Sequence, residues 1–179
     1  MQQVEEIKLH FQDEEWPYEG TDHDREIVRG VVYDDCGNFY FARLDRDDIF
    51  GKAIVIETSG GGVEKGEELT TAIVRELQEE LGVNVEIECK IGVVEDYYNL
   101  IHRHNINNYY LCRVISFGKT NLTEDEINSF HLTTLTLTYD EAVAEYNKRA
   151  TTRLGRILAK RELPILEQAK RILDARKAN

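Results

Sequence analysis

The chain has 179 residues, of which 41% are hydrophobic and 31% charged, a composition typical of one globular domain that buries its own core. Its 22 Lys and Arg against 34 Asp and Glu give a formal net charge of −12, which argues against a nucleic-acid partner because an acidic surface repels the phosphate backbone. No apolar run approaches the roughly 20 residues that span a bilayer, and no secretory leader is apparent. The three widely spaced cysteines form neither a disulfide framework nor a metal-ligand spacing. We therefore expect a cytoplasmic protein without a membrane partner.

The first third of the chain predicts strands. Residues 1–25 are an acidic N-terminal extension in which Ile7, Leu9 and Phe11 alternate at the spacing of a strand. A hairpin and a third strand are expected at Glu26–Tyr33, Phe39–Leu44 and Lys52–Glu57. We expect the glycine run 60–62 to end the third strand.

A helix is predicted over Glu67–Leu81 in the middle of the chain. Aliphatic residues recur at every fourth position from Leu69, and Gly82 follows where a left-handed cap ends a helix. Beyond it we expect strands at 83–97, 108–117 and 134–138, a short helix at 140–147, and two tail helices broken near Pro164. This order predicts a layered α/β or α+β domain with a mixed sheet.

The C-terminal tail is basic although the chain as a whole is acidic. From Lys148 onward there are ten Lys and Arg against three Asp and Glu, a net of 10 − 3 = +7. We expect residues 148–179 to pack as helices on the acidic body of the same domain, the alternative being a surface that faces a phosphate or a partner. A homodimer is a further expectation, because the N-terminal patch and the amphipathic tail each offer an apolar face.

Three carboxylates stand out on the predicted helix. At about 100° per residue, Glu76, Glu79 and Glu80 fall within an arc of about 100° at the edge of the inward face. Like charges at this spacing repel, and burial without cations would cost several kcal/mol for each. Oxygen ligands suit a hard cation such as Mg²⁺ or Mn²⁺, whereas the alternative is an acidic face in solvent.

The segment from Gly61 to Val83 resembles the Nudix box, G-x5-E-x7-R-E-U-x-E-E-x-G-U, where U is aliphatic. The match is complete, at Gly61, Glu67, Arg75, Glu76, Leu77, Glu79, Glu80, Gly82 and Val83. The resemblance extends over residues 26–147, the expected Nudix hydrolase domain, and leaves residues 1–25 and 148–179 outside it.

The resemblance implies an α/β/α sandwich with a central mixed sheet. It implies a metal-dependent pyrophosphohydrolase that cleaves a nucleoside diphosphate linked to another moiety (NDP-X) into NMP and P-X. By position in the box, the implied ligands of Mg²⁺ or Mn²⁺ are Glu76, Glu80 and the carbonyl of Gly60, with Glu79 as a ligand or a bridging partner. Glu67 and Arg75 would orient these groups, and Arg75 also stands i, i+4 from Glu79.

Family members often draw one more Glu from a loop beyond the box helix, as a ligand or as the general base. Here that region contains Glu126, our first choice, and Glu124, our second, with a turn of exposed acids as the alternative reading. One departure is visible, because Ser59 stands where family members often carry Pro. We interpret it as a change in loop rigidity and not as inactivation.

Residues 97–110 are rich in aromatic, His and amide side chains, which can stack on a base and hold phosphates. The expected substrate contacts are Tyr97, Tyr98, His102, Arg103 and His104, and the alternative is a plain loop tip between two strands. The sequence leaves the identity of X open.

Two further functions remain in view. A catalytically silent Nudix domain could bind a nucleotide as a sensor or scaffold, although such a protein need not keep three metal-binding glutamates. A regulator whose basic C-terminal helices bind DNA is the weakest reading, since about 30 residues are short for a winged helix with its own core.

Overall fold

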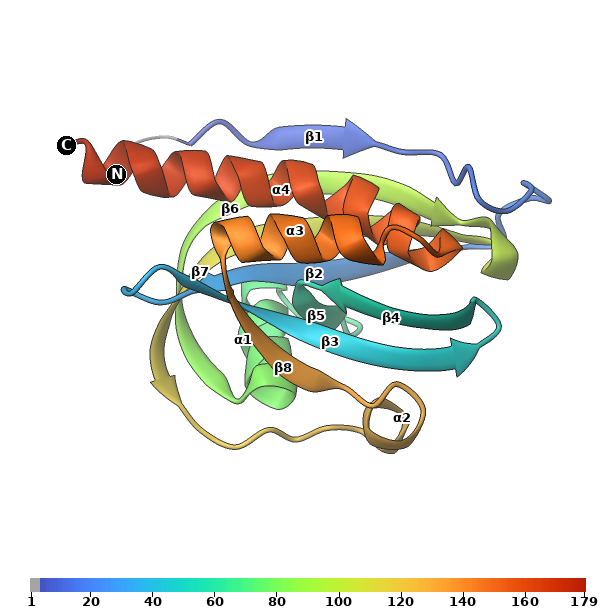
Figure 1. Cartoon of the computed structure of the whole chain (residues 1–179), viewed down its shortest axis with the longest axis horizontal. Helices are drawn as coiled ribbons and strands as arrows, with labels where there is room; N and C mark the ends of the chain where they lie inside the picture. Colours follow the sequence, from blue (N-terminus) through green and yellow to red (C-terminus); the bar gives the residue numbers. More distant parts are fainter. Residues whose placement is uncertain (1–3) are drawn as a thin grey trace.

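The computed structural model describes residues 4–179 and places a mixed sheet between two helical layers (Figure 1). The strands are β1 (Ile7–His10), β2 (His23–Tyr33), β3 (Asn38–Asp48), β4 (Gly51–Glu57), β5 (Ser59–Gly62), β6 (Val83–Tyr98), β7 (Arg103–Phe117) and β8 (Thr133–Thr138). The helices are α1 (Leu69–Leu81), the 3-10 turn η1 (Asn99–Ile101), α2 (Glu124–Asn128), α3 (Tyr139–Arg149) and α4 (Arg153–Lys177). Between residues 4 and 179, none of these helices has both the length and the apolar character that a membrane span requires.

The sheet is mixed because two of its pairings are parallel. Its strands follow the order β1-β6-β7-β2-β3-β4, with β5 paired to β2 and β8 paired to β3. β1 pairs in parallel with β6 and β2 with β7, whereas the other neighbours are antiparallel. The segment 51–62 first pairs with β3, through β4, and then crosses to pair with β2, through β5. This crossing brings the glycine-rich β5 next to α1.

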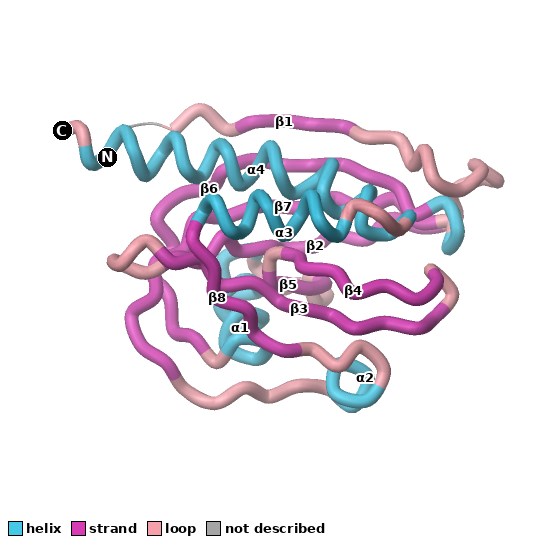
Figure 2. Tube along the Cα trace, viewed as in Figure 1, coloured by secondary structure: helices cyan, strands magenta, loops and turns pink. Residues whose placement is uncertain are grey.

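The two faces of the sheet are covered by different helices. Figures 1 and 2 show α1 behind the strands and α3 and α4 in front of them. Successive residues of β2 alternate accordingly, since Val28 and Val32 pack with α1 and Val31 packs with α3 and α4. The α/β/α sandwich with a central mixed sheet that the sequence predicted is therefore confirmed.

Helix α1 ends where its sequence predicts. Gly82 adopts φ 65°, and its N–H donates to the carbonyl oxygens of Gln78 and Leu77, which is the left-handed cap that glycine adopts without strain. Ile73 and Leu77 are completely buried on the inward face. Because this packing fixes the helix against the sheet, the glutamates on the same edge have a fixed direction.

Two predictions about the elements are wrong. The glycine run does not simply end a strand, because Ser59–Gly62 pairs with β2 as β5. The tail is one helix from Arg153 to Lys177 and continues through Pro164. A proline inside a helix costs about 3 kcal/mol, and we attribute its tolerance to the flanking residues Ile165 and Leu166, which are buried in the core.

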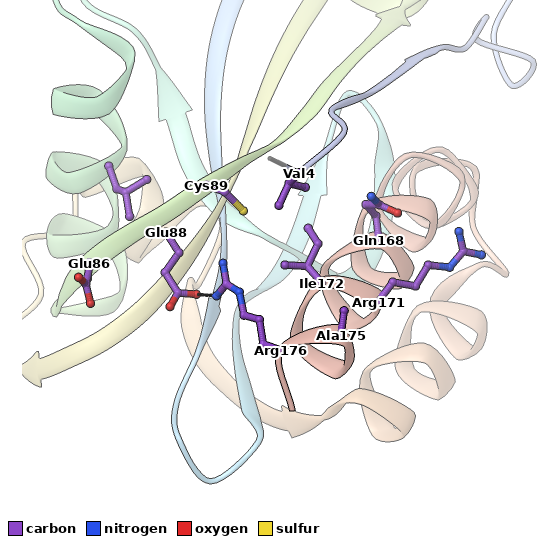
Figure 3. Close-up of a pocket in the computed structure, with 10 residues that line it drawn as sticks. Val4, Glu86, Glu88, Cys89, Gln168, Arg171, Ile172, Ala175 and Arg176 are labelled. Atoms are coloured by element: carbon purple, nitrogen blue, oxygen red, sulfur yellow. Dashed lines mark hydrogen bonds and ion pairs between the residues drawn. The ribbon is translucent and has the colours of Figure 1, made fainter. Parts of the chain in front are cut away.

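The basic helix α4 packs against acidic residues near the N-terminus. Arg156 forms an ion pair with Glu15, and Lys160 lies 3.1 Å from Glu14. Figure 3 shows the groove between α4 and β6, where Arg176 donates to Glu88 over 2.7 Å. The N-terminal patch and the apolar face of α4 both pack within this chain, so the expected homodimer stays a prediction with no surface assigned to it.

Candidate functional site

Glu80 of α1 lines a cleft that the glycine strand β5 also borders. Its Oε2 accepts hydrogen bonds from Ser59 Oγ at 2.5 Å and from the Gly60 N–H at 3.1 Å. The residue is 8% exposed, and burial raises the pKa of its carboxyl to about 8. Within residues 4–179, no Lys, Arg or His lies within 4.0 Å of this carboxylate. A buried carboxylate that lacks a cationic partner is a natural position for a metal ligand.

Glu76 lies one turn earlier and faces the same strand. Its Oε1 accepts a hydrogen bond from Arg75 Nη1 at 2.7 Å, and burial raises the pKa of its carboxyl. The carboxylate packs directly on Gly61, where an added Cβ would stand 2.5 Å from Oε2. The absence of a side chain at Gly61 is therefore what allows Glu76 to reach this position.

Arg75 connects the segments that carry these groups. It donates to both oxygens of Glu67, at 2.8 and 2.9 Å, and to the carbonyl oxygen of Gly62 at 3.3 Å. These hydrogen bonds lower the pKa of the Glu67 carboxyl to about 2. A guanidinium that bonds Glu67 in this forked way keeps a fixed orientation, so Arg75 and Glu67 are placed to hold Glu76 in the cleft.

Glu79 is placed differently from its two neighbours. Its side chain is 39% exposed and lies 3.4 Å from Arg75 Nη1. Among the residues that the structure describes, no three His, Cys, Asp or Glu side chains already surround one point. Glu76 and Glu80 nevertheless supply carboxylate oxygens at one cleft wall beside the Gly60 backbone, and this oxygen-only donor set fits a hard divalent cation.

The cleft has a volume of about 430 Å³ and three kinds of lining. Acidic side chains come from Glu57, Glu76, Glu80 and Glu126, and basic ones from Arg25, Arg29, Arg46 and Arg103. The apolar and aromatic part consists of Ile27, Leu44, Phe50, Tyr98, Ile101, Phe130 and Leu132, and the glycine strand completes the wall. A cleft that combines opposite charges with aromatic rings suits a ligand with phosphates and a flat ring system.

The structure distinguishes the two loop glutamates. Glu126 lines the cleft, and its negative charge contributes to the raised pKa of Glu76 and Glu80. It belongs to α2 and accepts a hydrogen bond from the Thr123 N–H at 2.7 Å, as part of a capping box. Glu124 is exposed and does not line the cleft, so of the two loop glutamates only Glu126 is a cleft residue.

Only two of the five expected substrate contacts face the cleft, namely Tyr98 and Arg103. Tyr97 stacks on His104 at a centroid distance of 4.9 Å, and His104 Nδ1 lies within hydrogen-bond distance of Asp24 Oδ1, at 2.9 Å. His102 Nδ1 lies 3.2 Å from the carbonyl oxygen of Gly20. Tyr97, His102 and His104 are thus engaged outside the cleft lining.

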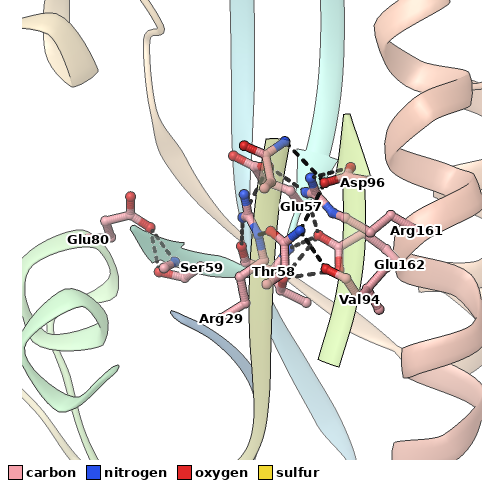
Figure 4. Close-up of polar contacts among 12 residues, drawn as sticks. Arg29, Glu57, Thr58, Ser59, Glu80, Val94, Asp96, Arg161 and Glu162 are labelled. Carbon is pink, nitrogen blue, oxygen red and sulfur yellow. Dashed lines mark hydrogen bonds and ion pairs between the residues drawn. The ribbon is translucent and has the colours of Figure 1, made fainter. Parts of the chain in front are cut away.

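Sequence reasoning missed the buried charges behind the cleft (Figure 4). Arg161 of α4 is 1% exposed and donates to Glu57 Oε2 at 3.2 Å. It also donates to the Tyr98 hydroxyl at 2.8 Å. The next residue, Glu162, accepts two hydrogen bonds from Thr58, one from Oγ1 at 3.0 Å and one from the backbone N–H at 3.3 Å. The available signal was a charged pair, Arg161-Glu162, within the apolar stripe of the tail.

The contact between Gly61 and Glu76 leads to a testable expectation. The Gly61→Ala variant should fold with nearly normal stability, because the group in the way is the far end of a Glu side chain, which can rotate aside, and not backbone. The displaced carboxylate should lower kcat by about 10- to 100-fold if the cleft is catalytic. Gly118→Ala is the matched control, since its added Cβ finds its nearest neighbour at 3.7 Å. Equal activities of the two variants would show that the position of Glu76 is irrelevant to turnover.

Comparison with known proteins gives a consistent result. The sequence model of the NUDIX domain matches residues 23–154. A search of curated proteins finds no match.

Solved structures with similar folds include a NUDIX hydrolase from Nitrosomonas europaea, with a TM-score of 0.60 and 18% identity over 79% of this chain and 90% of that one. A MutT protein from Methanosarcina mazei Go1 has a TM-score of 0.60 and 16% identity over 87% and 97%. An ADP compounds hydrolase has a TM-score of 0.58 and 17% identity over 88% and 76%. At these identities the structural likeness concerns the fold.

Proposed function

The chain belongs to the Nudix hydrolase family, and from this premise we propose that it is a metal-dependent pyrophosphohydrolase that cleaves NDP-X into NMP and P-X. The observation that carries the proposal is Glu80, a buried carboxylate with no cationic partner in the described chain, next to Glu76 in a cleft with opposite charges. Similar folds include proteins described as an ADP compounds hydrolase and as a UDP-X diphosphatase, which supports a nucleotide derivative as the substrate class.

We infer that Glu76, Glu80 and the carbonyl of Gly60 would hold Mg²⁺ or Mn²⁺, and that Glu79 can join them by leaving Arg75. When bound, such an ion neutralises phosphate charge and lowers the pKa of water. Arg75 and Glu67 keep Glu76 in place through the hydrogen bonds described above. An ion held by the box helix would thus supply the positive charge that the diphosphate needs, although the protein as a whole is acidic.

The reaction requires a base for the attacking water. Water adds to a phosphorus of the diphosphate, the bond from that phosphorus to the bridging oxygen breaks, and the products are NMP and P-X. We assign the departing water proton to a carboxylate oxygen of Glu126, which lines the cleft. Glu79 is the second candidate and Glu124 is not retained, because it is exposed away from the cleft.

The alternative is a silent Nudix domain that binds a nucleotide without turnover. Both functions are tested by incubating the purified protein with NDP-sugars, ADP-ribose, dinucleoside polyphosphates and dNTPs, with Mg²⁺, with Mn²⁺ or with a chelator. We expect metal-dependent release of a nucleoside monophosphate from at least one compound and none with the chelator. Nucleotide binding by calorimetry without any release would favour the sensor and contradict the enzyme.

A further inference from the structure

Two of the four arginines in the cleft have no acidic partner among the residues that the structure describes. Arg29 lies 3.2 Å from Glu57 and Arg46 lies 2.6 Å from Asp48. For Arg25 and Arg103, no carboxylate lies within 4.0 Å anywhere in residues 4–179, and both line the cleft. Because partnered and unpartnered arginines share one cleft, the difference between them points to a ligand that supplies the missing negative charge.

The two unpartnered arginines act on each other. Burial lowers the pKa of the Arg103 guanidinium, and the positive charge of nearby Arg25 lowers it further. Arg103 is fixed in place, since its Nε donates to Asn105 Oδ1 at 2.7 Å and its guanidinium lies 5.1 Å from the centre of the Tyr98 ring. A pair of like charges in a partly buried position is unfavourable until an anion binds between them.

Arg25 also lies next to the carboxylate wall. Its guanidinium rests against Gly62, where an added Cβ would stand 3.1 Å from Nε and Nη2. The preceding residue, Gly61, supports the Glu76 carboxylate in the same way. Glu76 and Arg25 thus stand against adjacent residues of β5, and both arginines line the same cleft as Glu76 and Glu80, so one extended anion can contact both groups.

We propose that Arg25 and Arg103 form a subsite for a phosphate beyond the diphosphate that is cleaved, an inference that rests on the proposed function. The substrate class is then nucleotides in which X carries a further phosphate, such as dinucleoside polyphosphates or nucleoside triphosphates, in preference to those with a neutral sugar as X. Guanidinium groups match phosphate oxygens with two parallel hydrogen bonds, and two such groups suit a group with several negative charges.

The test compares phosphate-rich and neutral substrates in matched variants. Arg25→Gln, Arg103→Gln and the double variant are assayed with a dinucleoside tetraphosphate and with an NDP-hexose, next to Arg43→Gln, which lies outside the cleft lining. We expect each cleft variant to lower kcat/KM for the tetraphosphate by about 10-fold or more and to change the NDP-hexose value little. Equal losses on both substrates would overturn the proposal, because the arginines would then contact the scissile diphosphate itself.

A third substrate separates phosphate from any negative charge. A UDP-uronic acid has a carboxylate on X, and we expect it to behave like the NDP-hexose. If it is favoured as strongly as the tetraphosphate, and loses as much in the double variant, the subsite recognises a single negative charge and the assignment to phosphate is wrong.

A binding measurement keeps the inference independent of turnover. Inorganic tripolyphosphate and pyrophosphate are titrated by calorimetry, with Mg²⁺, into the unmodified protein and the double variant. We expect tripolyphosphate to bind at least about 10-fold more tightly than pyrophosphate, and this difference to vanish in the variant. If the protein hydrolyses no substrate but still binds tripolyphosphate more tightly than pyrophosphate, only the proposed function is refuted. If it hydrolyses a substrate but binds the two anions equally well, only the subsite is refuted.

Discussion

Replacing Glu80 with Gln is expected to lower kcat by on the order of 100-fold or more while the protein stays folded. Gln has the same shape and can still accept the hydrogen bonds from Ser59 and Gly60, but it lacks the charge that a divalent cation needs. The measurement is metal-dependent release of nucleoside monophosphate. Glu68→Gln is the matched control, because Glu68 is exposed at the start of the same helix and should leave the rate unchanged.

The same variant should change how stability depends on pH. The pKa of the Glu80 carboxyl is raised from 4.5 to about 8 in the folded protein, so the folded state binds the proton more tightly than the unfolded state does. This contribution to the free energy of unfolding is fully present below pH 4.5 and is lost as the pH rises through 8. Gln cannot ionise. Without metal, Glu80→Gln should therefore melt at a higher temperature than the unmodified protein at pH 8, and the gap should close toward pH 5.

Adding Mg²⁺ provides the decisive comparison. It should raise the melting temperature of the unmodified protein, because an ion that binds only the folded state stabilises it, and it should affect Glu80→Gln little. Normal turnover in Glu80→Gln would show that Glu80 is not part of the catalytic site. An equal Mg²⁺ shift in both proteins would place the cation elsewhere.

Replacing Arg161 with Met should destabilise the protein by about 3–5 kcal/mol, because it leaves the buried carboxylates of Asp96 and Glu162 without their cation. Arg161 contacts Glu57 at 3.2 Å, Asp96 at 3.4 Å and Glu162 at 3.2 Å. For a domain of this size the loss corresponds to a fall in melting temperature of roughly 10 °C. The stability of Arg161→Lys should lie between those of the unmodified protein and Arg161→Met, because Lys keeps the charge but not the forked hydrogen bonds.

The control variant is Arg171→Met, which changes an arginine of the same helix. Arg171 pairs with Glu167 in solvent, with exposed side-chain fractions of 70% and 56%, so Arg171→Met should change the unfolding free energy by less than about 1 kcal/mol. Denaturant unfolding of the three variants measures these differences. A loss of less than about 1 kcal/mol in Arg161→Met would show that the buried network contributes little to stability.

The box helix could be predicted because its information lies in consecutive residues. The four-residue repeat fixes which face of α1 is buried, Gly82 fixes its end, and the complete motif from Gly61 to Val83 predicts the family. The family and the sandwich fold were confirmed. These features need no knowledge of which distant segments meet.

The tail and the glycine run were misjudged for the opposite reason. Pro164 favours a helix start by local rules, yet α4 continues through it where neighbouring residues are buried against the sheet. Ser59–Gly62 has the composition of a turn, but it finds an antiparallel partner in β2. In both segments, tertiary packing overrides the local preference.

The composition of the cleft depended on strand register. β6 and β7 pair Tyr97 with His104 and Tyr98 with Arg103, and successive pairs in a sheet point to opposite faces. The sequence by itself determined the family, the sandwich and the helix with its glutamates, since periodicity and motif are local. Only the tertiary structure decided that Tyr98 and Arg103 face the cleft and that Arg161 supports it from behind, because pairing register and helix docking join residues that are far apart in the chain.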